Sequence, residues 1–330
     1  MKLLAIFAIA VAFSVGSARA EGVGFRDVLV EAGGERLRTA LWYPTEAASE
    51  RTTVGPFTMN ATRDASPGAG PYGLVLISHG TGGGRLNHRE TAIRLAEGGY
   101  IVAAPEHAGD SWRDGTYSGT AENWRRRPRQ LSAVLDRLIG DAELGPRIDP
   151  ARIGAIGHSA GGYSVLALVG GRADLTSLLH HCTRHRDEDP QFCAYGRPGG
   201  QDDTALPSAM PSLSDPRVGA VAAVAPVGAL FGEGAFADVT VPAQIHRLAE
   251  DRVLREPWHA ENIAALLGDR ARLIVHPAAH HFAFITPFPD AMVDGVGAPA
   301  RDPAGFDRRA FLAEIDGQIL DFLDGTLPAP

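Results

Sequence analysis

The stretch that decides the fold of this chain is Gly157-His158-Ser159-Ala160-Gly161-Gly162-Tyr163. Residues 152–156, just before it, alternate small and branched apolar side chains and predict a short buried strand. The apolar run at 164–169, just after it, predicts a helix start. Strand, G-x-S-x-G and helix in this order form a nucleophile elbow, a sharp turn that lifts a serine hydroxyl off the strand end. The alternative is a glycine-rich strand-to-helix turn in which Ser159 is incidental.

Alternating strand and helix patterns surround this turn. An expected antiparallel hairpin at residues 25–30 and 36–43 opens the chain. The repeated β–α units that follow predict an α/β fold with a mostly parallel central sheet and helices on both faces. The further expected strands are residues 74–78, 100–104, 218–227, 241–246 and 272–276, and the further expected helices are residues 86–97, 122–140, 258–267 and 306–323.

Two segments interrupt the alternation of strand and helix patterns. Residues 44–72 are rich in Pro, Thr, Ser and Gly and are interpreted as a surface excursion. Residues 172–216 have no sustained period and are interpreted as a lid-like insertion over the strand ends, with a disordered loop as the alternative. No linker divides the chain, so residues 21–330 are expected to form one domain.

The first 20 residues resemble a secretory signal. Lys2 precedes an apolar run over residues 3–15, and Ala18-Arg19-Ala20 forms an A-x-A cleavage site. The apolar run is short for a membrane span. We therefore expect cleavage after Ala20 and a periplasmic or secreted protein without stable membrane insertion.

Charge and lysine content exclude several classes of function. The formal net charge of −8 over 330 residues argues against nucleic acid as a partner. Lys2 is the only lysine in the sequence. The expected mature chain therefore contains no Ser-Lys dyad, Schiff-base lysine or Walker-type phosphate loop, and any base for Ser159 has to be a histidine.

The sequence contains two cysteines, Cys182 and Cys193. In an exported protein, a pair this close in sequence predicts a disulfide. The alternatives are two free thiols, or half of a metal site with His180, His181 and His185, although this spacing matches no recognised zinc motif.

Functional groups of an open α/β sheet gather in loops at the carboxyl ends of its strands. A reactive serine needs a histidine base, which in turn needs a carboxylate to orient it. The loop after the last strand offers His280 and His281, of which His281 is favoured. The loop after the preceding strand offers Asp251, which lies one residue deeper in the loop than Glu250 and is preferred to it; Asp238 is a weaker candidate.

Two backbone amides are expected to hold the oxyanion. One belongs to Ala160, directly after the serine, and the other to Thr81, in the glycine-rich loop 79–84. That loop also resembles a phosphate cradle, but no lysine completes one; the remaining alternative is a tight turn.

At this point the sequence resembles the α/β-hydrolase superfamily, and within it the serine esterases similar to dienelactone hydrolase and platelet-activating-factor acetylhydrolase. The motifs that carry the resemblance are spread over residues 74–290 in the family's order. They are Ser78-His79-Gly80-Thr81-Gly82-Gly83, Ala104-Pro105-Glu106-His107 with Asp110-Ser111, Gly157-His158-Ser159-Ala160-Gly161-Gly162, Glu250-Asp251 and His281-Phe282-Ala283-Phe284.

The resemblance implies Ser159 as nucleophile, His281 as base, Asp251 as acid, Thr81 and Ala160 as oxyanion donors, and no metal or organic cofactor. It implies an exported serine hydrolase that cleaves small-molecule carboxylic esters through an acyl-enzyme. Dienelactone hydrolase proper has a cysteine at the position of Ser159, so its substrate does not transfer. The alternatives are a lipase, thioesterase or peptidase with the same triad, or a catalytically silent binding protein. The sequence does not determine the oligomeric state.

Overall fold

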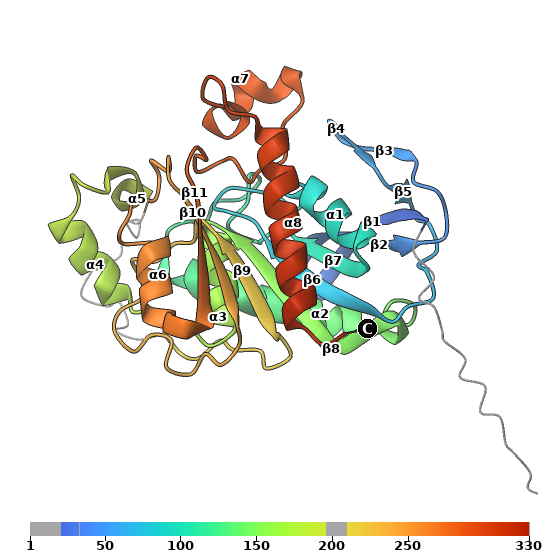
Figure 1. Ribbon diagram of the computed structural model, residues 1–330, viewed down its shortest axis with the longest axis horizontal. Helices are drawn as coiled ribbons and strands as arrows, with labels where there is room; N and C mark the ends of the chain where they lie inside the picture. The colour runs from blue at the N-terminus through green and yellow to red at the C-terminus, as the bar shows by residue number, and fades with distance from the viewer. Residues whose placement is uncertain (1–20, 33, 196–209, 330) are drawn as a thin grey trace, which may run out of the picture.

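The structure is a computed structural model that describes residues 21–32, 34–195 and 210–329. Within these ranges, a nine-stranded sheet has the order β11-β10-β9-β8-β6-β7-β2-β1-β5 (Figure 1). Strands β6 to β11 pair in parallel, whereas β2 pairs antiparallel with β7 and with β1. The predicted mostly parallel sheet is confirmed. Its strands are β1 (Gly22–Ala32), β2 (Glu35–Thr45), β5 (Thr62–Arg63), β6 (Tyr72–Ser78), β7 (Tyr100–Pro105), β8 (Ile148–His158), β9 (Ala220–Val224), β10 (Ala243–Leu248) and β11 (Ala271–His276).

Helices cover both faces of this sheet, which is why its central strands are continuous apolar runs. One core lies between the sheet and α2, α3 and α6, and the other lies between the sheet and α1 and α8. In Figure 1, α8 and α1 cross in front of the strands. These helices are α1 (Arg89–Glu97), α2 (Ala121–Ile139), α3 (Ala160–Leu168), α6 (Ala260–Leu267) and α8 (Arg308–Thr326).

Helix α2 shows how the sequence dictates these elements. Thr120 caps its first turn, with its Oγ1 accepting from the Asn123 amide at 3.2 Å. Leu131, Val134 and Leu135, at the spacing of one helix face, are completely buried against the sheet. The packing of this face stabilises a helix that also carries Pro128 in its interior.

The excursion at residues 44–72 contains more regular structure than predicted. It holds the antiparallel hairpin of β3 (Arg51–Val54) and β4 (Phe57–Asn60), besides β5. The hairpin turn uses Gly55 with φ 57°, which a glycine adopts without strain. These four-residue strands are too short for their alternation to stand out from a loop pattern.

The region proposed as a lid-like insertion is partly helical. Its described part contains α4 (Leu175–Arg184) and α5 (Pro190–Tyr195), while residues 196–209 lie outside the described residues, as does the expected signal segment 1–20. A further short helix, α7 (Val293–Val296), precedes α8, and 3-10 turns lie at Gly145–Arg147, Gly268–Arg270, Asp290–Met292 and Ala298–Ala300. In the described ranges, no helix combines the length and apolarity needed to cross a bilayer.

Candidate active site

Ser159 stands at the junction of β8 and α3, where the sequence predicts the elbow. Its backbone has φ 56° and ψ −118°, a conformation that costs a residue other than glycine about 1–3 kcal/mol. The Ser159 amide donates to the Val224 carbonyl of β9 at 3.0 Å, and its carbonyl accepts from the Val227 amide at 3.2 Å. The surrounding structure therefore holds a strained residue in place, as is typical of functional sites.

Glycines allow three backbone segments to meet at this serine. A Cβ atom at Gly157 would overlap the Gly161 carbonyl, and one at Gly161 would overlap the Ser78 carbonyl at the end of β6. A Cβ atom at Gly80 would lie only 3.3 Å from the Ser159 Cβ. The loop after β6 is therefore in close contact with the elbow.

Asp251 and His281, 30 residues apart in the chain, form a buried pair. The His281 Nδ1 lies 2.6 Å from the Asp251 Oδ2, and the two side chains are 5% and 4% exposed. The other carboxylate oxygen, Oδ1, accepts from the amides of Val253 (2.7 Å) and Leu254 (2.8 Å). Because the carboxylate is fixed by these amides, it orients His281 with Nδ1 as donor and Nε2 free to accept a proton.

The neighbouring candidates point elsewhere. The Nε2 of His280 pairs with the Asp302 Oδ1 at 2.9 Å. Glu250 is exposed, and Asp238 pairs with Arg172 at the surface. Of the candidate histidines and acids, the structure thus brings together the two that were favoured.

Ser159 and His281 line the same cavity, which has a volume of about 1060 Å³. Within the described part of the chain, no hydrogen bond joins the Ser159 Oγ to His281; such bonds commonly tighten only when substrate binds. Much of the wall is apolar and comes from the β3–β4 turn, from the loops after β7, β9, β10 and β11, from α2 and α5, and from the segment around α7. It includes Val54, Pro56, Phe57, Trp112, Trp124, Phe192, Val227, Leu254, Phe282, Ile285, Phe288, Met292 and Val296.

The two expected oxyanion donors lie beside the serine. Thr81 lines the cavity, and Ala160 is the first residue of α3, where helix geometry leaves amides without an intrahelical partner. In residues 21–32, 34–195 and 210–329, neither amide donates to a protein acceptor. Both donors are thus available for a negatively charged oxygen.

Buried neutral histidines support the walls of the site. The Nε2 of His158 lies 2.8 Å from the His281 carbonyl, tying the elbow to the histidine loop. Burial lowers the pKa of His158 well below its ordinary value. His79 Nε2 accepts from the His107 amide at 3.0 Å, so Nδ1 carries the proton and donates to the Gly80 carbonyl. Burial, aided by the Arg127 charge, lowers the pKa of His79 to about 3.

The sequence of this chain is similar to that of known proteins. The model of the prolyl oligopeptidase family matches residues 87–176. Cutinase 2 of Thermobifida cellulosilytica is 30% identical over 152 residues, which are 41% of this chain and 54% of that protein. Cutinase cut1 of Thermobifida fusca matches equally, over 41% of this chain and 44% of its own length. The chain spans about half the length of the curated relatives it matches.

Two solved structures extend the likeness over nearly the whole chain. A ferulic acid esterase from Streptomyces cinnamoneus superposes with a TM-score of 0.65 at 21% identity, covering 96% of this chain and 94% of that one. A dienelactone hydrolase-like promiscuous phosphotriesterase from metagenomic libraries gives 0.57 at 16% identity, covering 93% and 100%. This chain has the α/β-hydrolase fold. The predicted resemblance to the serine esterases of this fold is confirmed.

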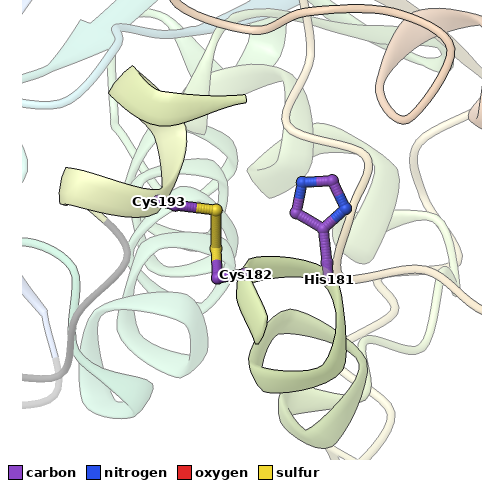
Figure 2. A group of neighbouring side chains, drawn as sticks. All are labelled: His181, Cys182 and Cys193. Atoms are coloured by element: carbon purple, nitrogen blue, oxygen red, sulfur yellow. A yellow bond between two sulfur atoms is a disulfide. The ribbon is translucent and has the colours of Figure 1, made fainter. Parts of the chain in front are cut away.

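An arm, defined here as α4, α5 and the residues between them, packs beside the cavity. A disulfide joins Cys182 to Cys193 with an S–S distance of 2.07 Å, as predicted. Figure 2 shows the sulfur atoms bonded to each other, so neither is a free thiolate beside His181. The disulfide holds α5 against α4, and the α5 residue Phe192 lines the cavity.

His181 and Asp189 of the arm contact His259 at the start of α6, and in the part of the chain that the structure describes these three residues form a fully buried group that could hold a metal ion. Both histidine Nε2 atoms lie 2.8–2.9 Å from the Asp189 Oδ2. His259 Nδ1 accepts from the Gly228 amide, so its Nε2 keeps the proton that a metal ligand would have to lose. Burial raises the pKa of Asp189, but hydrogen bonds from His181 and His259 lower it to about 2. The group fits a hydrogen-bonded anchor better than a metal site.

Sequence reasoning missed Arg127 beside the candidate site, and it cited Asp110 only as part of a motif, without its contact with Arg127. Both side chains are fully buried and paired with each other. A signal for Arg127 was present, because it lies four residues before Leu131 on the face of α2 that contacts the sheet. A charged residue in that register predicts a buried ion pair.

Proposed function

We propose that this chain is a serine hydrolase that cleaves carboxylic esters through an acyl-enzyme. The observation that carries the proposal is the Asp251–His281 pair on the cavity that Ser159 enters from a strained elbow. The cutinase relatives and the ferulic acid esterase neighbour support this reaction class. The apolar cavity fits a neutral small-molecule ester.

In this mechanism, His281 Nε2 takes the proton of the Ser159 hydroxyl as its oxygen attacks the ester carbonyl carbon. The carbonyl oxygen becomes an oxyanion, which accepts hydrogen bonds from the Thr81 and Ala160 amides. The intermediate collapses, and the alcohol leaves with the proton from His281. Water then attacks the acyl-enzyme by the same route and releases the acid. Asp251 stays ionised and stabilises the His281 imidazolium.

Substitution of Ser159 tests this proposal. Ser159→Ala is expected to abolish turnover of p-nitrophenyl butyrate and labelling by a fluorophosphonate probe, with unchanged circular dichroism. Ser214→Ala, at an exposed serine, is the matched control and is expected to keep both ester turnover and labelling by the probe. Turnover and labelling by Ser159→Ala at the wild-type level would refute the assignment. Absence of labelling in the wild-type protein would instead favour a silent binding protein.

A peptidase with the same triad is the second candidate, and the match to the prolyl oligopeptidase family favours it. A p-nitroanilide and a p-nitrophenyl ester of the same acyl group separate the two reactions. We expect the ester to be cleaved at least 10³-fold faster in kcat/KM; comparable values would assign the chain as a peptidase. Thioester and long-chain ester substrates in the same assay distinguish a thioesterase or a lipase.

We also propose that the protein is exported and that residues 1–20 are removed. The basic start, apolar run and A-x-A site support this, as does the disulfide between Cys182 and Cys193. Protein recovered from the periplasm or medium is expected to begin at Glu21. An intact residue 1 in a cytoplasmic fraction would contradict the proposal.

A further inference from the structure

A buried ion pair lies beneath the glycine-rich loop of the site. Arg127 of α2 and Asp110, in the loop after β7, are both fully buried, with Nη1 and Oδ2 2.6 Å apart. The other Arg127 nitrogens are also engaged. Nε donates to the Ser164 Oγ of α3 at 3.0 Å, and Nη2 donates to the Ser78 Oγ at 3.3 Å and to the His79 carbonyl. One side chain thus connects α2, α3 and the end of β6.

Asp110 holds the same loop from another point. Its Oδ1 accepts from the Gly82 amide at 3.3 Å and from the Ser118 hydroxyl at 2.5 Å. Its Oδ2 accepts from the Asn123 side chain at 2.7 Å, besides Arg127. Every oxygen of the carboxylate is therefore occupied, and none of these partners belongs to the Ser159, His281 and Asp251 group.

The two contacts fall on either side of Thr81. Arg127 binds the carbonyl two residues before it, and Asp110 binds the amide directly after it. Between these contacts Gly80 and Gly82 flank Thr81, and Gly82 has φ 66°. The Gly80 carbonyl, in the same peptide unit as the Thr81 amide, accepts from His79 Nδ1 at 2.7 Å and from the Gly83 amide at 3.0 Å. Thr81 itself is exposed. These bonds orient the peptide unit within the loop, and the two flanking contacts fix the loop against α2 and the segment after β7. The position of the Thr81 amide relative to Ser159 therefore depends on both.

We infer that Arg127 and Asp110 are positioning residues that set the Thr81 amide at the distance an oxyanion requires; this rests on the proposed function. A contribution to stability alone explains this buried ion pair less well, because replacing both members of such a pair by apolar residues often leaves the stability of a protein unchanged or raises it. An oxyanion donor acts only within about 2.7–3.1 Å of the developing charge, and loss of one such donor costs about 10²–10³-fold in kcat.

Arg127→Lys tests this inference, because an ammonium group cannot reach Asp110, Ser164 and the His79 carbonyl together. We expect kcat for p-nitrophenyl butyrate to fall about 10²-fold, with KM within threefold of wild type. The Ki of a trifluoromethyl ketone, whose adduct carries the oxyanion, is expected to rise by a similar factor. Asp110→Asn, which keeps side-chain volume but removes the ion pair, is expected to lower kcat at least tenfold by the same route.

Arg152→Lys is the matched control. Arg152 is also buried and donates to Asp324 and to the Tyr100 hydroxyl, but it lies in the first half of β8, away from the loop. This variant is expected to lower the Tm and leave kcat and Ki unchanged. If Arg127→Lys and Asp110→Asn change only the Tm, or raise KM without lowering kcat, the inference is wrong. A failure of the proposed function would be recognised by a different result, namely esterase activity retained by Ser159→Ala.

Discussion

Asp251→Asn is expected to disable the site while leaving the fold intact. In the structure, Asp251 Oδ1 accepts from two backbone amides and Oδ2 accepts from His281 Nδ1–H at 2.6 Å. In the variant, the two amides select the side-chain oxygen of asparagine, so its NH2 group faces His281. That group donates, and therefore fixes the His281 tautomer with the proton on Nε2. A protonated Nε2 cannot accept the Ser159 proton.

The expected loss follows from this tautomer. Where a triad carboxylate is replaced by its amide, kcat falls on the order of 10⁴-fold, which corresponds to about 5 kcal/mol of transition-state stabilisation. KM is expected to change little, because Asp251 is buried behind His281 and contributes no atom to the cavity wall. The Tm is expected to stay close to wild type, because both backbone amides keep their acceptor.

The assay measures kcat and KM for p-nitrophenyl butyrate together with the rate of fluorophosphonate labelling, and both rates should fall by a similar factor. Asp302→Asn is the control, because it removes the carboxylate partner of the adjacent His280. Its kcat is expected to stay within threefold of wild type. If Asp251→Asn keeps more than a tenth of wild-type kcat, or if Asp302→Asn falls equally far, the assignment of acid and base is wrong.

Three further perturbations concern stability and substrate size. Burial raises the pKa of Asp316 to about 7, so the folded chain keeps a proton that the unfolded chain releases. The free energy of unfolding is therefore expected to fall by up to about 4 kcal/mol between pH 4 and 7. In urea titrations, Asp316→Asn should not show this dependence of the unfolding free energy on pH. Asp189→Asn removes one of the two carboxylate oxygens that accept hydrogen bonds where the arm contacts α6, and calorimetry should show a Tm lower by several degrees. Phe57→Ala removes an aromatic wall of the cavity and should raise KM about tenfold for p-nitrophenyl octanoate but not for the acetate; equal effects would refute this role.

The order of elements was predictable because each central strand is a short apolar run and each covering helix has an apolar face. The strand through residues 152–156, the Ser159 turn and the helix after it follow from local spacing alone. The hairpin of β3 and β4 was missed because its strands have four residues each. Their pairing is visible only once the chain has turned back on itself.

For the site, local sequence identified the residue types and their loops, and position in the loop favoured His281 and Asp251 over their neighbours. The pairing of the two side chains is visible only in the structure, where the His280 imidazole contacts Asp302 and the His281 imidazole contacts Asp251. Asp189 and His259 are 70 residues apart, so their contact has no local signature.

The sequence by itself predicted the alternation of strands and helices, the elbow at Ser159 and the pairing of the cysteines, because each depends on neighbouring residues or on simple counts. The tertiary structure alone decided that Asp251 contacts His281, that the β3–β4 hairpin and the arm form part of the cavity wall, and that Arg127 binds the His79 carbonyl, two residues before Thr81. The reason is physical. A side chain's direction within a folded core depends on packing among segments distant in the chain, and spacing along one segment carries no record of it.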